Sequence, residues 1–507
     1  MFFILSPLSG LLATLALPPV NQGWAGLLGL GVLYALLQNN ASIKKSFALG
    51  WLWAFGYFTG GLYWISWALT HDMEKFGWLI PFAVLGLPAA LAVYGGLAAA
   101  AFAHLRQKNW GGPFTFSLLL LATEWLRGHL FTGFPWNMFG MFWGGVPGIA
   151  QSASVVGLYG LTFLTIITAA VGAEAMRNSQ RHKQVAMVGC VMVFWGVVWM
   201  VGEARLHASQ TSDASHAPQP SAPLIRIVQP SISPTDKWDA AKRVENFQKL
   251  MALSAPRAGD TAAPHIILWP ETALDYRLAQ SDIYRQQLSA LLSPGRYVLT
   301  GVIRRNTATG QSFNSMVAYD HDGQVVGHYD KHHLVPFGEF VPFRSFAPVA
   351  TLAAGVGDFS HGRGPTTWAL PHLPAFSPLI CYEVIFSGRA TTLPRPDFLL
   401  NITNDSLYEK TSGPHQHAAM ARWRAIEEGL PLVRAANTGL SMVVDAYGRT
   451  LEQLDLYEVG RIDARLPPAL PPTLFATWRH GPLMLLLLAA ASGAWVWRRF
   501  HHEIKNP

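Results

Sequence analysis

The sequence has few cysteines and little charge. Only Cys190 and Cys381 occur in 507 residues, and Cys190 lies in an apolar stretch, so we expect no disulfide between them. Charged residues make up 13% of the chain, well under the roughly 25% that is usual in globular proteins. With a net charge of +7 and no long block of like charge, the chain shows no nucleic-acid-binding arm, and we expect no nucleic-acid partner.

The deficit of charge is concentrated in the first 202 residues, which we interpret as a membrane bundle. Most of its apolar runs are long enough to cross about 30 Å of hydrocarbon. We therefore predict an α-helical bundle of eight transmembrane helices plus a separate α/β domain. The predicted parts are a seven-helix bundle (1–202), a polar linker (203–223), an α/β domain (224–479), and a last transmembrane helix with a short tail (480–507).

The basic loop residues predict the orientation. With eight spans, the four cationic clusters fall on one side of the membrane, which the positive-inside rule makes cytoplasmic. Both termini are then cytoplasmic and the α/β domain lies on the opposite side. The clusters are Lys44 with Lys45, Arg106 with Lys108, Arg177 with Arg181 and Lys183, and Arg498 with Arg499.

An aromatic, Gly- and Pro-rich segment at 128–153 interrupts the apolar pattern. It fits either an interfacial aromatic belt or a re-entrant wall of a lipid-binding cavity, since non-helical backbone in a membrane must be buried or line a cavity. Just before it, Glu124 and Arg127 are three residues apart and can pair on one helical face.

Residues after the linker alternate between strand-like and helix-like stretches, which favours a layered αββα domain. Helices are expected near 238–255, 281–293 and 414–430. The expected strands are Leu224–Val228, His265–Leu268, Tyr297–Ile303, Ser315–Tyr319, Pro378–Cys381, Phe398–Ile402 and Ser441–Val444.

Three polar residues follow β-like runs in this domain: Glu271 in ILWPET, Lys331 in YDKHHLVPFGEFVP and Cys381 in PLICYEVIF. Each alone has an ordinary explanation. Cys381 fits a buried small hydrophobe, Glu271 a helix cap and Lys331 a solvated loop. The adjacent His332 and His333 would point to opposite faces of a strand, which disfavours joint metal ligation.

In this order, the Glu, the Lys and the Cys resemble the triad of the nitrilase (carbon–nitrogen hydrolase) superfamily. Glu271 would act as general base, Lys331 would stabilise an oxyanion, and Cys381 would attack a carbonyl to form a thioester. Glu339, eight residues past Lys331, and Glu383 would orient these groups.

Further motifs narrow the resemblance to the apolipoprotein N-acyltransferase family, the integral-membrane branch of that superfamily. They are EWLRGHLFTGFPW (124–136), NITND (401–405), GPHQHAAMARWRAIE (413–427) and RAANTG (434–439). The positions that agree with the family's surrounding site are Trp238, Tyr382, Glu383 and Asn404.

The resemblance implies a multi-pass protein of the bacterial inner membrane with a periplasmic nitrilase-like domain. The implied acyl donor is a glycerophospholipid, typically phosphatidylethanolamine. The implied acceptor is the α-amino group of the N-terminal diacylglyceryl-cysteine of an apolipoprotein. We expect a monomer, and neither a cofactor nor a metal.

Some positions depart from the family pattern. Ser231 stands where an Asn is more usual, and Leu407 and Tyr408 follow Ser406 where an aromatic pair is usual, which leaves acyl-chain and head-group preference open. The stretch 343–364 fits either a lid over the lipid entrance or a surface loop.

Two other functions are compatible with parts of the pattern. A membrane-anchored amidase of the nitrilase type would use water as acceptor, although an anchor needs only one span. A transporter with a soluble sensor domain would carry ionisable residues in mid-span or inverted repeats, and neither is evident in the sequence.

Overall fold

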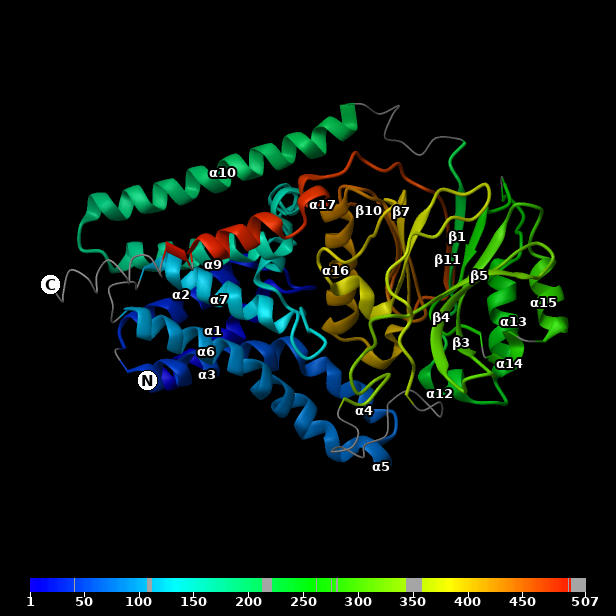
Figure 1. Ribbon diagram of the computed structural model, residues 1–507, viewed down its shortest axis with the longest axis horizontal. Coiled ribbons are helices and arrows are strands. Elements are labelled where there is room, and N and C mark those ends of the chain that lie inside the picture. Colours follow the sequence, from blue (N-terminus) through cyan, green and yellow to red (C-terminus); the bar gives the residue numbers. More distant parts are fainter. Residues whose placement is uncertain are drawn as a thin grey trace. The chain divides into compact units, whose positions relative to one another are not determined.

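The computed structural model describes residues 1–40, 42–106, 112–211, 221–260, 262–274, 276–279, 281–342, 358–490 and 492–493 (Figure 1). The chain divides into two compact units, considered one at a time below. Unit 1 comprises 1–63, 84–205 and 472–507, and unit 2 comprises 64–83 and 206–471. The central part of the predicted linker, 212–220, and most of the predicted lid, 343–357, lie outside the described residues.

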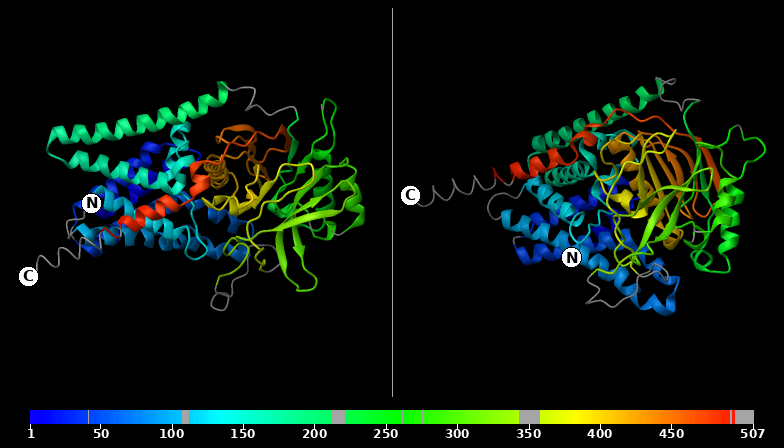
Figure 2. Two further views of the ribbon diagram at one scale, coloured as in Figure 1. Left: turned by 45° about the horizontal axis from the view of Figure 1, so that its top comes forward. Right: turned by 45° about the vertical axis from the view of Figure 1, so that its right-hand side comes forward.

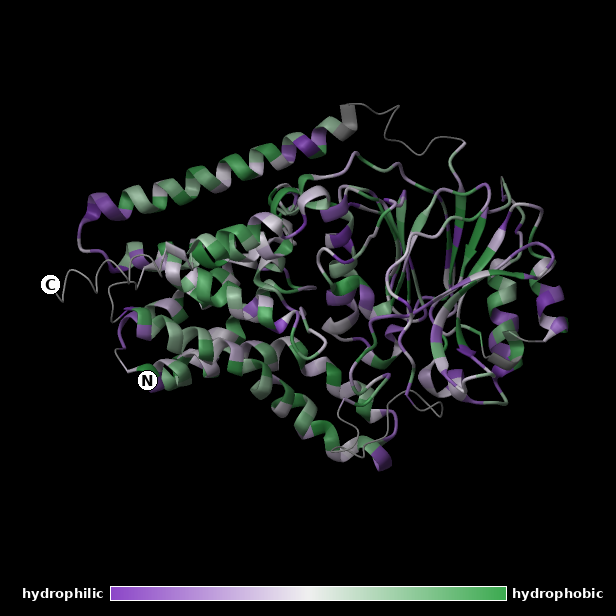
Figure 3. Cartoon of the chain, viewed as in Figure 1, coloured by the Kyte–Doolittle hydropathy of each residue, from purple (hydrophilic) through white to green (hydrophobic). Residues whose placement is uncertain are grey.

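Unit 1 is a bundle of apolar helices. Figure 3 shows one of them, α10, as hydrophobic along its middle with hydrophilic residues at its start and near its other end. The helices are α1 (Phe2–Ala13), α2 (Gly23–Gln38), α3 (Ile43–Leu62), α6 (Leu87–Arg106), α7 (Pro113–Arg127), α8 (Pro147–Ala150), α9 (Ala153–Arg177), α10 (Arg181–Thr211, which runs to the end of a described range) and α17 (Leu474–Trp478).

Three helical stretches in the described part of the chain are long and apolar enough to cross a membrane: Met73–Arg106, Ala153–Arg177 and Arg181–Ala208. Shorter apolar helices are Phe2–Ala16, Gly23–Gln38 and Gly481–Ala490. Membrane-type helices are therefore present, whereas the count of eight spans stays a prediction.

Glycine brings α1 and α3 into backbone contact. A Cβ on Gly10 would lie 1.9 Å from the carbonyl oxygen of Trp53, and a Cβ on Gly56 would lie 2.2 Å from that of Pro7. Small residues of this kind are the usual means by which helices approach closely in a membrane.

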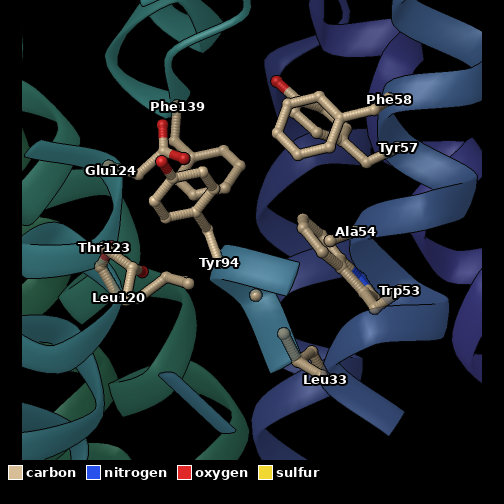
Figure 4. A pocket seen from close by; sticks show the side chains of 11 residues that line it. Leu33, Trp53, Ala54, Tyr57, Phe58, Tyr94, Leu120, Thr123, Glu124 and Phe139 are labelled. Atoms are coloured by element: carbon tan, nitrogen blue, oxygen red, sulfur yellow. Dashed lines mark hydrogen bonds between the residues drawn. The ribbon is translucent and has the colours of Figure 1, made fainter. Parts of the chain in front are cut away.

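The aromatic segment between α7 and α9 is largely buried within unit 1. It contains the 3-10 turn η5 (Phe139–Trp143), and Trp136, Asn137 and Met138 before it are almost fully inaccessible. Figure 4 shows a pocket in which Phe139 of this turn lies near Glu124 of α7 and Tyr94 of α6, facing Tyr57 and Trp53 of α3. The segment thus lines an internal pocket of the bundle.

Unit 2 contains two β-sheets. The first has the order β11-β1-β2-β3-β4-β5 and the second β10-β9-β8-β7-β6. The strands are β1 (Leu224–Gln229), β2 (Ile266–Leu268), β3 (Tyr297–Arg305), β4 (Ser312–Tyr319), β5 (Val325–Asp330), β6 (Phe376–Ile380), β7 (Phe398–Thr403), β8 (Leu432–Ala436), β9 (Ser441–Val444), β10 (Thr450–Leu454) and β11 (Gly460–Arg465).

The sheets pack face to face, and helices cover their outer faces (Figures 1 and 2). Residues of both sheets, such as Leu268, Met316, Ile380 and Leu400, share one buried cluster. The helices α13 (Arg243–Ser254), α14 (Tyr276–Ala279) and α15 (Asp282–Ser289) cover the first sheet, and α16 (Ser412–Glu428) covers the second. The predicted αββα sandwich is confirmed.

Residues 64–83, which follow α3 in the chain, pack within unit 2. Trp64 donates from Nε1 to Oε1 of Gln416 over 3.2 Å, and its ring meets that of Tyr408 edge-on at 4.6 Å. This segment contains α4 (Trp67–Thr70) and α5 (Met73–Phe76). It therefore covers the start of α16 and the 3-10 turn η7 (Asp405–Tyr408).

Candidate active site

Glu271 lies just after β2, on a backbone that passes very close to β3. A Cβ on Gly301 would lie 2.2 Å from the backbone nitrogen of Thr272, so only glycine fits at position 301. Thr272 itself has a φ of +48°, a conformation that is costly for a β-branched residue. The close approach and the strained turn together fix where the Glu271 side chain begins.

The Glu271 carboxylate is buried and accepts two hydrogen bonds. Nδ2 of Asn314, on β4, donates to Oε1 over 2.7 Å, and the backbone N–H of Asn404, after β7, donates to Oε2 over 2.8 Å. The side chain is thus held between the ends of strands from the two sheets.

Lys331 follows β5 and is almost fully buried between two carboxylates. Its Nζ lies 2.9 Å from Glu339 and 3.6 Å from Oε1 of Glu271. Burial alone would lower the pKa of Lys331, but Glu339, then Glu271 and Cys381, raise the pKa above its ordinary value. The ammonium group therefore stays charged at neutral pH.

Asn314 links the same two carboxylates. Besides its bond to Glu271, Nδ2 donates to Oε1 of Glu339 over 2.8 Å. The other Glu339 oxygen accepts from the backbone N–H of Val335 over 2.8 Å. Glu339 therefore contacts both Lys331 and Asn314, and Asn314 is a polar residue of this cluster that the sequence analysis missed.

Cys381 directly follows β6 and begins the 3-10 turn η6 (Cys381–Ile385). Its φ is +50°, a left-handed conformation that non-glycine residues adopt at a cost of about 1–3 kcal/mol. Burial, and then the charge of Glu271, raise the pKa of the Cys381 thiol, while Lys331 opposes the rise. At neutral pH the thiol is therefore protonated, and it would need a base in order to act as a nucleophile.

Glu383 connects the turn that carries Cys381 to the segment that carries Lys331. Oε1 accepts from the backbone N–H groups of His332 and His333 over 2.8 and 3.2 Å, and Oε2 accepts from that of Ile380 over 2.8 Å. Burial opposes the charge, but the hydrogen bond and charge of the His332 side chain, and then the backbone N–H of Ile380, lower the pKa of Glu383 overall. Tyr382 is buried beside it, 5.7 Å from the ring of His333.

The rings of the two adjacent histidines contact different residues. Nδ1 of His332 lies 2.6 Å from Glu383, whereas the His333 ring packs 3.9 Å from that of Phe386. The two rings therefore have different surroundings.

Trp238 differs from the other predicted site residues because its side chain is 44% exposed. It ends α12 (Pro234–Trp238), and its described contacts include Nζ of Lys237, 5.9 Å from its ring centroid. Lys237 in turn donates from Nζ to the backbone carbonyl of Glu271 over 2.9 Å. The structure thus places a second lysine, which the sequence analysis missed, directly beside Glu271.

The positions that depart from the family pattern lie near the site. Ser231 has a φ of +49°, a region in which Asn is favoured over Ser, which gives a physical reason for the more usual Asn. Leu407 and Tyr408 lie in η7, where the Tyr408 ring meets Trp64.

The arrangement suits acyl chemistry on a thiol. A carboxylate, a charged lysine and a protonated thiol come from the ends of three strands, as nucleophilic catalysis with a general base and an oxyanion donor requires. The positions of Glu271, Lys331, Glu339, Glu383 and Asn404 could be anticipated because each follows or lies near a β-like run. Asn314 could have been found as a polar residue inside an apolar strand.

Comparisons with known proteins find similar sequences over nearly the whole chain. A family model described as "Apolipoprotein N-acyltransferase N-terminal domain" matches residues 9–171, and one described as "Carbon-nitrogen hydrolase" matches residues 224–471. The chain is 35% identical to the apolipoprotein N-acyltransferase of Rhodopseudomonas palustris, over 96% of this chain and 93% of that protein. It is 37% identical to that of Brucella melitensis, over 97% of this chain and 96% of that protein.

Among solved structures, the chain is similar to an amidase of the nitrilase superfamily from Nesterenkonia, with 22% identity and a TM-score of 0.37. The match covers 52% of this chain and 97% of the amidase. A carbon–nitrogen hydrolase superfamily protein from Xanthomonas campestris has 18% identity and a TM-score of 0.35, over 53% of this chain and 97% of that protein.

Proposed function

Because the chain belongs to the apolipoprotein N-acyltransferase family, we propose that it transfers an acyl chain from a membrane glycerophospholipid, through a thioester on Cys381, to the α-amino group of an apolipoprotein. The enzyme class, an acyltransferase, is that of its relatives. The observation that most supports this site is the buried Glu271–Lys331–Glu339 cluster beside a cysteine held in a strained turn.

In the first half-reaction, Glu271 takes the thiol proton as Sγ of Cys381 attacks an ester carbonyl of the phospholipid. Lys331 stabilises the oxygen that becomes negative in the tetrahedral intermediate. When the intermediate collapses, the C–O bond breaks and Glu271 returns the proton to the departing lysophospholipid. The acyl chain is then bound to Cys381 as a thioester.

In the second half-reaction, the α-amino group of the diacylglyceryl-cysteine attacks the thioester. Glu271 accepts a proton from the amine, the C–S bond breaks, and the proton returns to the thiolate of Cys381. The product is an amide-linked third acyl chain. We propose phosphatidylethanolamine as donor and a monomer as the working form.

The location belongs to the same proposal. Eight spans in the bacterial inner membrane, with both termini cytoplasmic and the catalytic domain periplasmic, would place the thiol where both lipid substrates are held. The one-sided distribution of basic loop residues supports this orientation. Trp238, Tyr382, Glu383 and Asn404 would then border the path of the acyl chain or support the reacting groups.

The test is intact-protein mass spectrometry after the purified enzyme is mixed with phosphatidylethanolamine vesicles and no acceptor. We expect a mass gain of one acyl chain, removable by hydroxylamine and mapped to Cys381. Cys381→Ser should show no such gain, whereas the matched control Cys190→Ser should be acylated normally.

Two results would oppose the proposal. Acylation of the Cys381→Ser variant would show that another residue is the nucleophile. Steady release of fatty acid without any amine acceptor, with no acyl-enzyme accumulating, would favour an amidase-like hydrolase that uses water.

A further inference from the structure

Three buried residues from three sequence motifs take no part in the mechanism above, yet they meet at one cluster in unit 2. NITND supplies Asp405, the motif that begins α16 supplies His417, and RAANTG supplies Arg434. All three side chains are at most 1% exposed. Burying three ionisable groups together is costly unless they are paired and oriented, so the cluster needs an explanation.

Asp405 is the centre of the cluster. Its Oδ2 accepts from NH2 of Arg434 over 2.8 Å, and its Oδ1 accepts from the hydroxyl of Thr403 over 2.9 Å. A Cβ on Gly439 would lie 2.4 Å from Oδ2, so the glycine that ends RAANTG leaves room for the carboxylate. Burial opposes ionisation, but Arg434 and then His417 lower the pKa of Asp405 to about 2.

His417 extends from this carboxylate to the nucleophile's own backbone. Its Nδ1 lies 2.9 Å from Oδ1 of Asp405 and 3.2 Å from NH2 of Arg434. Its Nε2 lies 3.1 Å from the carbonyl oxygen of Cys381. Since a carbonyl oxygen can only accept, Nε2 carries the hydrogen and donates it to Cys381.

This hydrogen bond acts on the peptide group that joins Cys381 to Tyr382. Cys381 has a φ of +50°, a strained conformation that persists only when surrounding contacts stabilise it. The peptide bond between Cys381 and Tyr382 is trans. Fixing the direction of its C=O group therefore also fixes the opposite direction of the Tyr382 N–H. The imidazole therefore determines how the turn presents the thiol and the next amide to the reacting carbonyl.

We propose that His417, oriented by Asp405, is a positioning residue that holds the Cys381 turn in its reactive conformation for acyl-enzyme formation. The inference rests on Cys381 being the nucleophile, as proposed above. His417 does not touch substrate; it acts through its hydrogen bond to the Cys381 carbonyl.

The test compares His417→Leu, which cannot donate, with His417→Gln, whose amide N–H can reach the same carbonyl. We expect His417→Leu to form the acyl-enzyme about 100-fold more slowly, as small misplacements of a nucleophile do, with little change in the phosphatidylethanolamine concentration at half-maximal rate. His417→Gln should recover most of the rate. Glu428→Gln, a buried change on the same helix whose carboxylate bonds Thr391, is the matched control and should acylate normally.

Equal rates for His417→Leu and the unaltered enzyme would overturn the inference, and so would equally slow Leu and Gln variants, since the donor would then be irrelevant. If His417→Leu fails to fold, His417→Asn replaces it because its amide is too short to reach the Cys381 carbonyl. A slow Asn and a fast Gln variant would support the inference, and equal rates would overturn it. Failure of the proposed nucleophile is separate, because only that failure leaves Cys381→Ser acylated.

Discussion

Glu383 accepts a hydrogen bond from the backbone N–H of His332 over 2.8 Å, although 51 residues separate them in the chain. The bond joins the turn after β6 to the segment after β5, and these two places carry Cys381 and Lys331. The relative position of the thiol and the ammonium group therefore depends on one buried carboxylate.

Glu383→Gln should loosen this connection. The amide keeps one acceptor but turns N–H groups towards backbone donors, which should cost about 1–3 kcal/mol of unfolding free energy. We expect acyl-enzyme formation to fall about 100-fold. Thermal unfolding in detergent and the mass assay check both effects, with the exposed Glu452→Gln as control.

The pH dependence of this variant has a definite sign. The pKa of Glu383 is lowered in the folded protein, so its charge stabilises the fold above the ordinary carboxyl range and this contribution is lost as pH falls through the folded pKa. The stability difference between the enzyme and Glu383→Gln should therefore shrink on acidification. A difference that stays constant from neutral pH to below pH ~4 would contradict the ionic role of Glu383.

Asn314→Asp should inactivate the enzyme. Its Nδ2 now donates to both Glu271 and Glu339, and a carboxylate there would place three acids around Lys331. We expect a loss of about 3–5 kcal/mol of unfolding free energy, as for buried charges left unpaired, and acylation below detection. Asn314→Ser, which restores a small donor, should be less harmful; an Asp variant as active as the Ser variant would show that the shared donor is unimportant.

Much of the αββα domain could be predicted from the sequence because its central strands are continuous apolar runs. The edge strands β5, β10 and β11 were missed because they are short, polar or partly exposed, as in TLEQL of β10. The missed strand β8 carries the buried Arg434 in its centre, which breaks the apolar pattern.

The site divides in the same way. Glu271, Lys331 and Cys381 could be predicted because they follow strands that end at one edge of the domain. Asn314 stands out as a polar residue inside an apolar strand, but its pairing with Glu271, 43 residues away, could not be predicted, and neither could that of His417 with Cys381, 36 residues away. Such contacts arise from the packing of two sheets and a helix, which local sequence does not encode.

Lys237→Met should stabilise the protein near neutral pH. Burial lowers the pKa of Lys237 to about 8, although Glu271 and Cys381 favour its charge. Between pH 8 and the ordinary lysine value near 10.5, the unfolded chain binds more protons than the folded protein, so the free energy of unfolding rises with pH. Over this range the folded protein loses the charge of Lys237, and with it the cost of burying that charge. The gain from Lys237→Met should thus be largest at pH 8 or below and fade towards pH ~10.5.

Thermal unfolding measured from pH 7 to 10 in detergent checks this expectation. Lys242→Met is the control: the hydrogen bond that exposed Lys242 donates to Glu245 raises the pKa of Lys242, so any pH effect should have the opposite sign. A gain in Lys237→Met that is the same at every pH would mean that the variant acts through packing.

Arg127→Met should destabilise unit 1. The buried guanidinium group pairs with Glu124 through Nε at 3.0 Å and NH2 at 2.5 Å, and NH1 donates to the carbonyls of Phe134 and Trp136 over 2.5 and 2.8 Å. It thus fastens the non-helical segment after α7 to the helix. Its loss would leave a buried carboxylate beside the pocket of Figure 4 without its cation, at a cost of about 3–5 kcal/mol.

A double-mutant cycle separates the ion pair from the bonds to the loop. Because Glu124→Gln removes the charge that Arg127→Met would strand, the double variant should be less destabilised than the sum of the two single variants, as judged by thermal unfolding in detergent. Arg127→Lys keeps a cation but cannot bridge Glu124 and two carbonyls, so it should lie between the unaltered protein and Arg127→Met. Strict additivity in the cycle would show that Glu124 and Arg127 act independently. The contribution of Arg127 to stability would then come from its two carbonyl contacts and not from the ion pair.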